Sequence, residues 1–370
     1  MSPVTLADIA RATGLSKSAV SLALRGDPQL PEATRTRVQA AAGNLGYRPN
    51  ALVSHLMAQL GAGRTRRIRA KLALVNANRD RAALRDHPTI PTYVAGCEQR
   101  AARLGYSFDR FWLHTPGLTP ARWSRILTTR GIRGLVLVGL MEANRLPEAL
   151  RPLWQAWPTV VTGVRTEGPA LSFASVDHHE LVLTAMRQVR ALGYRRPGLV
   201  LDDVIDRLVE RRFSAGFLTA QRDLPPRERL PVFSEVPRSR TPPPEFRTWL
   251  QRCDPDVLLV LYNNVLPWLA SCGRRVPQDL GVVQLEWRDH RPEIAGMHQH
   301  NFAVGAAAVD LVVAQIHHGE SGVQEFPRAT LIGATWTDGA SCPPRPRVPP
   351  PVRTRLVSSG PGPAGPVGMA

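Results

Sequence analysis

Six short apolar runs, separated by segments long enough to form helices, limit what residues 70–300 of this chain can fold into. The runs are KLALVNA (71–77), GLVLVG (134–139), TVVTGV (159–164), PGLVLD (197–202), DVLLVLY (256–262) and GVVQLE (281–286). Apolar strands that alternate with helices predict parallel sheets covered by helices on both faces. We therefore expect an α/β fold over most of the chain.

The chain has 370 residues, which is too long for one small core and suggests two or three folded units. It contains no uninterrupted apolar run long enough to span a membrane, and charged residues interrupt the first twenty positions. We therefore expect a cytoplasmic protein that has no membrane contact. The cysteines show no CxxC spacing, so they are expected to be reduced and without zinc: Cys97, Cys253, Cys272 and Cys342.

The formal net charge is +17, and the position of the charges tells more than their sum. Residues 1–69 carry ten basic side chains against three acidic ones, which suits a phosphate-binding segment, although a solvated basic face is an equal alternative. Apolar residues recur at helical spacing in 6–13 and in 17–24. The turn between them runs from Gly14 to Ser16, which is the spacing of a helix-turn-helix unit, and a third helix is expected over 32–44.

The second of these helices, over 17–24, is expected to read DNA. Val20 and Ala23 can face the first helix, which leaves the opposite face exposed. Small side chains there allow close approach to a major groove, in which Lys17, Ser18 and Leu22 can reach base edges. Four further residues are predicted to contact phosphates: Thr5, Ser16, Ser21 and Arg25.

This N-terminal region resembles the DNA-binding domain and hinge of the lactose-repressor/galactose-repressor family, over residues 3–60. The resemblance is carried by VTLADIARATGLSKSAVSLAL, PEATRTRVQAAAGNLGYRPN and ALVSHLMAQL. It implies that Lys17, Ser18 and Leu22 occupy base-reading positions, and that Leu56 is the wedge that a hinge helix inserts into the minor groove. Family members commonly carry arginine at the position of Leu22, so we expect a different operator half-site. Leu22 can either contact a thymine methyl group or only cover the surface of the helix without contacting DNA.

The remaining chain is similar, more loosely, to the two-lobed periplasmic-binding-protein-like domain of the same family, in segments such as ERRFSAGF and RVPQDLGVVQLEWRD. The expected domains are a helix-turn-helix domain over 1–48, a hinge and linker over 49–69, the two-lobed domain over 70–337 and a disordered, proline- and arginine-rich tail over 338–370. Within the large domain, we expect one lobe over about 70–163 and the other over about 164–298, with residues 299–337 crossing back.

Ligands of such sheets bind at the carboxyl ends of the strands. That rule nominates six loop residues: Asn76, Asn78, Asn263, Asn264, Glu286 and Trp287. Amide, carboxylate and indole groups suit a saccharide. The resemblance places Asn263 and Glu286 on effector-contacting positions. Arg212 is a further candidate, because it lies one position before the place where the family commonly has an arginine. Each residue has the alternative of an ordinary loop-capping role. Phe213 and Gly163 stand where the family commonly has an arginine and an acid, which leaves the ligand class open.

The sequence predicts neither a metal site nor a cofactor, because adjacent histidines such as His178 and His179, or His317 and His318, point apart on a helix. It predicts no enzyme, since no nucleophile elbow or P-loop occurs. The leading hypothesis is a homodimeric, ligand-responsive repressor on a pseudo-palindromic operator. The alternatives are a solute-binding protein and a regulator with a non-sugar effector.

Overall fold

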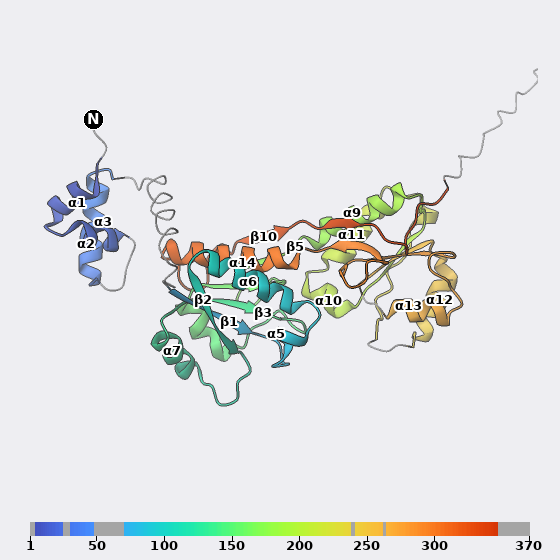
Figure 1. Ribbon diagram of the computed structural model, residues 1–370, viewed down its shortest axis with the longest axis horizontal. Helices are drawn as coiled ribbons and strands as arrows, with labels where there is room; N and C mark the ends of the chain where they lie inside the picture. Colours follow the sequence, from blue (N-terminus) through green and yellow to red (C-terminus); the bar gives the residue numbers. More distant parts are fainter. Residues whose placement is uncertain (1–3, 25–29, 48–69, 238–240, 262–263, 347–370) are drawn as a thin grey trace, which may run out of the picture.

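The computed structural model describes residues 4–24, 30–47, 70–237, 241–261 and 264–346. These residues form an N-terminal group of three helices and two α/β lobes (Figure 1). Three of the predicted site residues, Arg25, Leu56 and Asn263, lie outside the described residues, as does the side chain of Ser18. Among the described residues, no helix combines the length and apolar character that crossing a bilayer requires.

The first three helices are α1 (Leu6–Thr13), α2 (Lys17–Leu24) and α3 (Glu32–Asn44), with the bounds predicted from the sequence. A capping box starts α1, because the Thr5 backbone N–H donates to Asp8 at 2.9 Å, and a left-handed Gly14 ends it. Their shared core contains Ile9, Val20 and Val38, each fully buried. Local capping and one small apolar core thus position α2.

Lobe 1 is built on a six-stranded parallel sheet in the order β10-β5-β4-β3-β1-β2. Strand β1 lies inside the sheet and β2 forms an edge. The strands are β1 (Ala70–Asn76), β2 (Tyr106–Trp112), β3 (Ile132–Val138), β4 (Thr159–Thr162), β5 (Ser172–Val176) and β10 (Ala329–Ile332).

Lobe 2 is built on a five-stranded sheet in the order β11-β9-β8-β7-β6, in which only β11 runs antiparallel to its neighbour among the described strands. The strands are β6 (Pro197–Val200), β7 (Val257–Val260), β8 (Gly281–Gln284), β9 (Ala295–His298) and β11 (Thr335–Thr337). The predicted α/β class with parallel sheets is confirmed.

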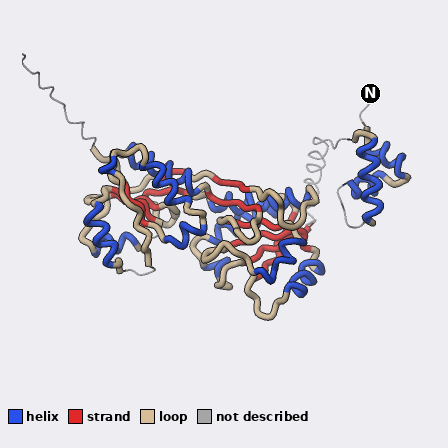
Figure 2. Tube along the Cα trace, turned by 180° about the vertical axis from the view of Figure 1, so that it is seen from behind, coloured by secondary structure: helices blue, strands red, loops and turns tan. Residues whose placement is uncertain are grey.

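Helices surround the strands of both lobes (Figure 2). Lobe 1 contains α5 (Ala83–Asp86), α6 (Ile90–Arg103), α7 (Pro120–Thr129), η1 (Glu148–Leu150), α8 (Arg151–Ala156) and α14 (Asn301–His317). Lobe 2 contains α9 (His178–Ala191), α10 (Asp203–Leu208), α11 (Arg212–Gln221), η2 (Pro226–Glu228), α12 (Pro244–Cys253) and α13 (Val265–Ser271). Helices α6 and α14 touch so closely that a Cβ on Gly305 would lie 2.1 Å from the Tyr93 carbonyl oxygen.

The predicted boundary between the lobes, near residue 164, is wrong. Strand β5 pairs with β4 in lobe 1, so the chain first crosses to lobe 2 after Val176. It returns to lobe 1 before α14 and leaves it again between β10 and β11. The sequence of β5, SFASV, is fully buried but too rich in small and polar residues to be recognised as an apolar run.

The prediction of a disordered tail from residue 338 is also wrong for its first part. The Tyr194 hydroxyl donates to the Pro343 carbonyl at 2.9 Å, and the Arg345 guanidinium lies 4.6 Å from the centre of the Tyr194 ring. Cys342 is buried, and Ser341 bonds both Val282 and Ala295 in the lobe 2 sheet. The return of the chain through β11 brings these residues onto lobe 2, where proline-rich composition does not prevent packing.

Candidate functional site

Helix α2 carries the residues that are predicted to read DNA, and this role stays a prediction. Lys17 is exposed and Leu22 is half-buried, while Val20 and Ala23 pack inward. Ser16 is the cap of this helix, since its hydroxyl accepts from the Ala19 N–H at 3.1 Å. A helix with small side chains on its outer face and a cation at its start has the shape and charge for a major groove.

Two of the predicted phosphate-contacting residues, Thr5 and Ser16, make hydrogen bonds at the starts of α1 and α2. The Thr5 hydroxyl donates to the Asp8 carboxylate at 2.7 Å, and these hydrogen bonds from Thr5 lower the pKa of Asp8 below its ordinary value. Ser21 is half-buried. As phosphate contacts, Thr5, Ser16 and Ser21 remain predictions.

A second group of polar side chains joins the two lobes. Glu286 follows β8 in lobe 2, and its Oε1 accepts from the Thr89 hydroxyl at 2.9 Å and from the Asn301 amide at 3.1 Å, both in lobe 1. The Arg288 guanidinium lies 2.8 Å from the same oxygen and donates to the Thr89 hydroxyl at 3.0 Å and to the Pro88 carbonyl at 2.6 Å. We call Thr89, Glu286, Arg288 and Asn301 the inter-lobe cluster.

Burial governs the electrostatics of this cluster. It raises the pKa of the Glu286 carboxyl above its ordinary value, although Arg288 and the three hydrogen bonds to Glu286 oppose the shift. The buried Tyr93 hydroxyl has a raised pKa as well, first because of its own burial and then because of the negative charge of Glu286. A carboxylate in such surroundings is a strong hydrogen-bond acceptor for a ligand that enters between the lobes.

Two buried polar atoms beside Glu286 have no hydrogen-bond partner among the described residues. They are the indole Nε1 of Trp287 and the amide Oδ1 of Asn301. The Trp287 ring lies 5.6 Å from that of His298, measured between centroids, and offers an aromatic surface. One donor, one acceptor and an aromatic ring next to a carboxylate are groups that bind hydroxyls and apolar ring faces.

The predicted asparagines have other contacts. Asn76 donates its amide to the carbonyls of Asp80 and Arg81, and Asn78 donates its amide to the carbonyl of Gly139. These bonds shape the loop after β1 and agree with the capping alternative. Asn264 donates to the Pro237 carbonyl at 3.2 Å. Effector contact by these three asparagines stays a prediction.

Arg212 lies beside two acids rather than in the inter-lobe cluster. Its guanidinium is 3.6 Å from Asp177 and 3.7 Å from Glu210. The neighbouring His178 packs on Phe213, with ring centroids 4.6 Å apart, and burial together with the charge of Arg212 lowers its pKa to about 3. Within the described residues, no group of three potential metal ligands occurs.

Sequence reasoning missed Thr89, Arg288, Asn301 and Tyr93. Thr89 and Asn301 each adjoin the start of a helix, and Arg288 lies two residues beyond Glu286. The rule that inspects residues directly after each strand finds Glu286 and Trp287 but not partners that arrive from the other lobe. A search of helix starts for polar residues would have found Thr89 and Asn301.

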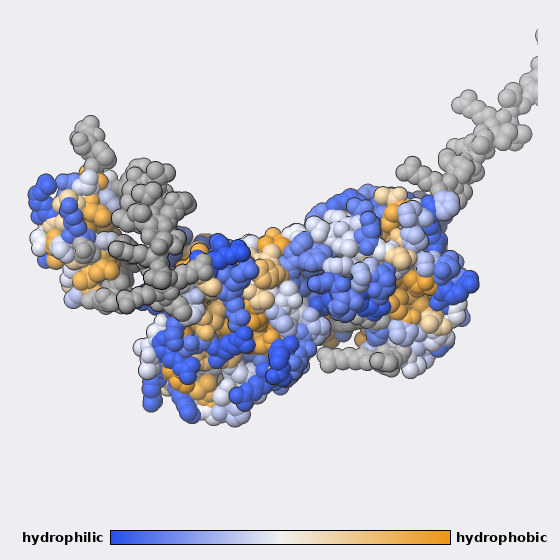
Figure 3. All heavy atoms as spheres, in the orientation of Figure 1, coloured by the Kyte–Doolittle hydropathy of each residue, from blue (hydrophilic) through white to orange (hydrophobic). Residues whose placement is uncertain are grey.

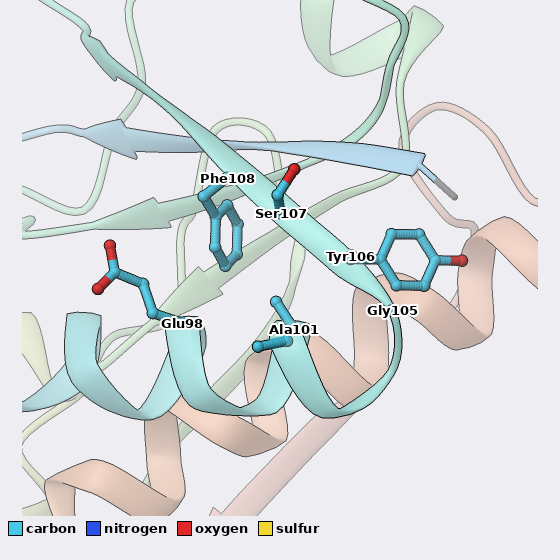
Figure 4. Close-up of a pocket in the computed structure, with 7 residues that line it drawn as sticks. Glu98, Ala101, Gly105, Tyr106, Ser107 and Phe108 are labelled. Atoms are coloured by element: carbon cyan, nitrogen blue, oxygen red, sulfur yellow. The ribbon is translucent and has the colours of Figure 1, made fainter. Parts of the chain in front are cut away.

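A separate hollow of about 430 Å³ lies on the edge of lobe 1, between α6 and the start of β2 (Figure 4). It is lined by Glu98, Ala101, Ala102, Gly105, Tyr106, Ser107 and Phe108. These residues lie where the strands of the sheet begin, whereas the loops after β1 and β3 lie where they end. The hollow is thus distinct from the inter-lobe cluster.

Two segments of the chain match models of known protein families. Residues 5–50 match the family model of bacterial regulatory proteins of the lacI family, and residues 186–342 match that of periplasmic binding protein-like domains. The HTH-type transcriptional regulator PtxS of Pseudomonas plecoglossicida is 26% identical over 89% of this chain and 94% of its own length. An uncharacterised HTH-type transcriptional regulator of Streptomyces limosus is 29% identical over 59% of this chain, a match that spans 58% of that protein.

Solved structures share the fold at low sequence identity. The lac repressor dimer bound to operator and the anti-inducer ONPF has a TM-score of 0.54 and 20% identity, covering 92% of this chain and 99% of the repressor chain. The complex of the transcriptional regulator CelR with cellobiose has a TM-score of 0.53 and 20% identity, covering 91% of this chain and 99% of that one. The fold expected from the sequence, a helix-turn-helix domain with a two-lobed α/β domain, is confirmed.

Proposed function

We propose that this chain, a DNA-binding transcriptional regulator of the lactose-repressor/galactose-repressor family, is a repressor whose operator affinity changes when a saccharide binds between its lobes. The observation that carries the effector part is the Glu286 carboxylate, which is held between the lobes by Thr89 and Asn301. A ligand that competes for this carboxylate changes contacts in both lobes at once. Binding is thereby linked to the arrangement of the lobes.

The groups around Glu286 support a polyhydroxylated ligand. A hydroxyl can donate to Glu286 or to the Oδ1 of Asn301 and can accept from the Nε1 of Trp287. The ring of Trp287 offers a surface for an apolar sugar face. The fold-related regulator CelR has been solved with cellobiose, which adds support at the level of ligand class.

Arg288 gives a specific reason to keep a second ligand class. Its guanidinium lies in the inter-lobe cluster and is largely buried, with 16% of the side chain exposed. A ligand that carries a carboxylate could pair with this guanidinium in place of Glu286. The second candidate is therefore a regulator whose effector is a small organic acid.

On the DNA side, the proposal assigns base reading to Lys17, Ser18 and Leu22 of α2, and minor-groove wedging to Leu56. Two copies of the chain would place two such helices in successive major grooves of a pseudo-palindromic operator. Effector binding in either copy would change the spacing of the two reading units, and operator would in turn change effector affinity by the same factor.

Selection of duplexes from a random DNA pool tests both halves of the proposal. The full-length protein is incubated with the pool alone, with a panel of neutral mono- and disaccharides, and with a panel of small carboxylic acids. We expect a palindromic motif whose enrichment changes with one of the saccharides. A change with the acids alone would select the second candidate, and the absence of any motif would contradict sequence-specific repression.

A further inference from the structure

We infer that the end of lobe 1 at which the chain enters is a second DNA-contacting surface, which binds phosphates of the duplex that α2 reads. This inference rests on the DNA binding described above and adds an interaction surface in a domain that otherwise binds the effector. We call this surface the basic end of lobe 1. It is formed by Lys71, Arg103, Arg130 and Arg133.

Strand register and helix ends bring these residues together. Ala70 at the start of β1 lies opposite Tyr106 at the start of β2, and Lys71 lies opposite Ile132 at the start of β3. The Tyr106 hydroxyl is 3.2 Å from the Nε2 of His317, the last residue of α14. Three strands therefore begin where α14 ends.

Two of the four basic residues enter this end from helix termini. Arg103 is the last residue of α6, three positions before Tyr106, and Arg130 follows the end of α7 directly. Arg133 is the second residue of β3 and follows Ile132, which lies opposite Lys71. Burial raises the pKa of the Tyr106 hydroxyl, and the positive charge of Arg133 opposes this shift.

The charge of the basic end is only partly balanced. Lys71 and Arg130 both pair with Asp109, at 3.2 Å and 3.4 Å, and both keep about half of their side chains exposed, 45% and 53%. Arg103 and Arg133 are exposed and take part in no ion pair within the described part of the chain. Hydrophilic side chains cover much of the surface of both lobes (Figure 3). Polarity alone therefore does not distinguish the basic end, whereas its excess of positive over negative side chains does.

Helix polarity accounts for only part of this excess. The C-terminal end of a helix carries a partial negative charge, which Arg103 and Arg130 help to neutralise at α6 and α7. Arg133 lies on β3 and Lys71 on β1, where no helix end requires a cation. Among the residues of the basic end and their ion-pair partner, four cations therefore face the single carboxylate of Asp109.

Chain continuity identifies DNA as the partner. Strand β1 is the first described element after the three DNA-binding helices, so this end of lobe 1 is the closest to them along the chain. The linker sequence over 49–69 contains Arg64, Arg66, Arg67 and Arg69 and no acidic residue, so the basic character is continuous into Lys71. Duplex DNA, with about one negative charge per 1.7 Å of its axis, is the complementary partner.

The test is the salt dependence of DNA binding by the full-length protein. Arg103→Gln and Arg133→Gln are combined in one variant, and the control is Arg252→Gln combined with Arg227→Gln, in lobe 2. Arg252 lies in the last turn of α12 as Arg103 does in α6, so loss of a helix-end cation is matched. Affinity for a selected operator duplex and for a random duplex is measured between about 50 and 200 mM salt.

Each lost phosphate contact lowers the slope of log affinity against log salt by roughly 0.9, so the double variant should show a slope smaller by about 1 to 2. Its affinity should fall at least about fivefold on both duplexes, because phosphate contacts do not depend on sequence. If slope and affinity equal those of the lobe 2 control, the basic end is a solvated face and the inference is wrong. Failure of the unaltered protein to bind any selected duplex would instead contradict the proposed function.

Discussion

The Arg288 guanidinium lies 2.8 Å from the Glu286 carboxylate, and both groups contact the Thr89 hydroxyl in the opposite lobe. The two side chains come from one loop of lobe 2 and are 16% and 15% exposed. An ion pair in such a position depends on both partners, since either charge alone would remain poorly hydrated. The pair is therefore both a structural link between the lobes and part of the proposed effector site.

Replacing Arg288 by methionine should leave Glu286 buried without its cation. We expect the free energy of unfolding at pH 7 to fall by about 3–5 kcal/mol, the range for breaking a buried pair. Chemical denaturation measures this loss. Arg275→Met is the control, because Arg275 pairs with Asp279 while keeping 75% of its side chain exposed, and its loss should be much smaller. Equal losses would contradict the importance of burial.

The raised pKa of Glu286 predicts a pH dependence of stability. The folded protein holds the proton of this carboxyl more tightly than the unfolded chain does, so its favourable contribution is full below the ordinary glutamate pKa. That contribution is lost as pH rises through the higher folded pKa. Relative to Glu286→Gln, the unaltered protein should therefore lose stability as pH rises above about 4.5. Denaturation curves at several pH values measure the difference, and a difference that grows in the opposite direction would contradict it.

The close contact of α6 and α14 predicts that Gly305 tolerates no side chain. A Cβ there would lie 2.1 Å from the Tyr93 carbonyl oxygen and 3.0 Å from the Cys97 nitrogen, both backbone atoms. Gly305→Ala should lower the free energy of unfolding by about 1–3 kcal/mol or more. In Gly333→Ala, the control, the added carbon meets nothing within 4 Å. Thermal unfolding of the two variants should differ, and similar melting temperatures would contradict the close packing.

Residues 341–346 should stabilise lobe 2, whereas deleting residues 347–370 should leave the melting temperature unchanged. Deleting residues 341–370 removes the hydrogen bonds of Ser341 and the contacts of Pro343 and Arg345 with Tyr194. Deleting only 347–370 keeps them. We expect a lower melting temperature for the longer deletion alone, and equal melting temperatures would show that these contacts contribute nothing.

Lys17 should contribute to sequence discrimination. We expect Lys17→Ala to weaken operator binding by about 1–3 kcal/mol and to weaken binding to random DNA less. Arg37→Ala, which removes the same charge from an exposed position on α3, is the comparison. Competition binding with both duplexes measures the ratio. An equal loss on both duplexes would reduce Lys17 to a phosphate contact.

The elements that the sequence predicts well are those with local signals. The caps Thr5 and Gly14 define α1, and the apolar runs of β1, β3 and β7 are buried on both faces. Strand β2, with the sequence YSFDRFW, lies at a sheet edge and is only half-buried, so its pattern is mixed and gives no prediction. Strand β5 is buried but short and rich in small residues, which displaced the predicted lobe boundary.

The candidate effector site is only half visible in the sequence for a related reason. Glu286 and Trp287 follow a strand that is easily recognised, but Thr89 lies 197 residues from Glu286 along the chain. No local pattern reports a contact made across two lobes. Asn76 and Asn78 illustrate the opposite error, because loop-capping amides and ligand-binding amides occupy the same positions after a strand.

Operator binding in the presence of ligand tests the central claim most directly. The operator affinity of the full-length protein is titrated with the saccharide found by selection, alongside Glu286→Gln and Glu325→Gln, the latter at an exposed position. We expect the saccharide to change operator affinity 5- to 150-fold for the unaltered protein and for Glu325→Gln, the range typical of coupled sites, and to have little effect on Glu286→Gln. An undiminished response in Glu286→Gln would contradict an effector site at the inter-lobe cluster.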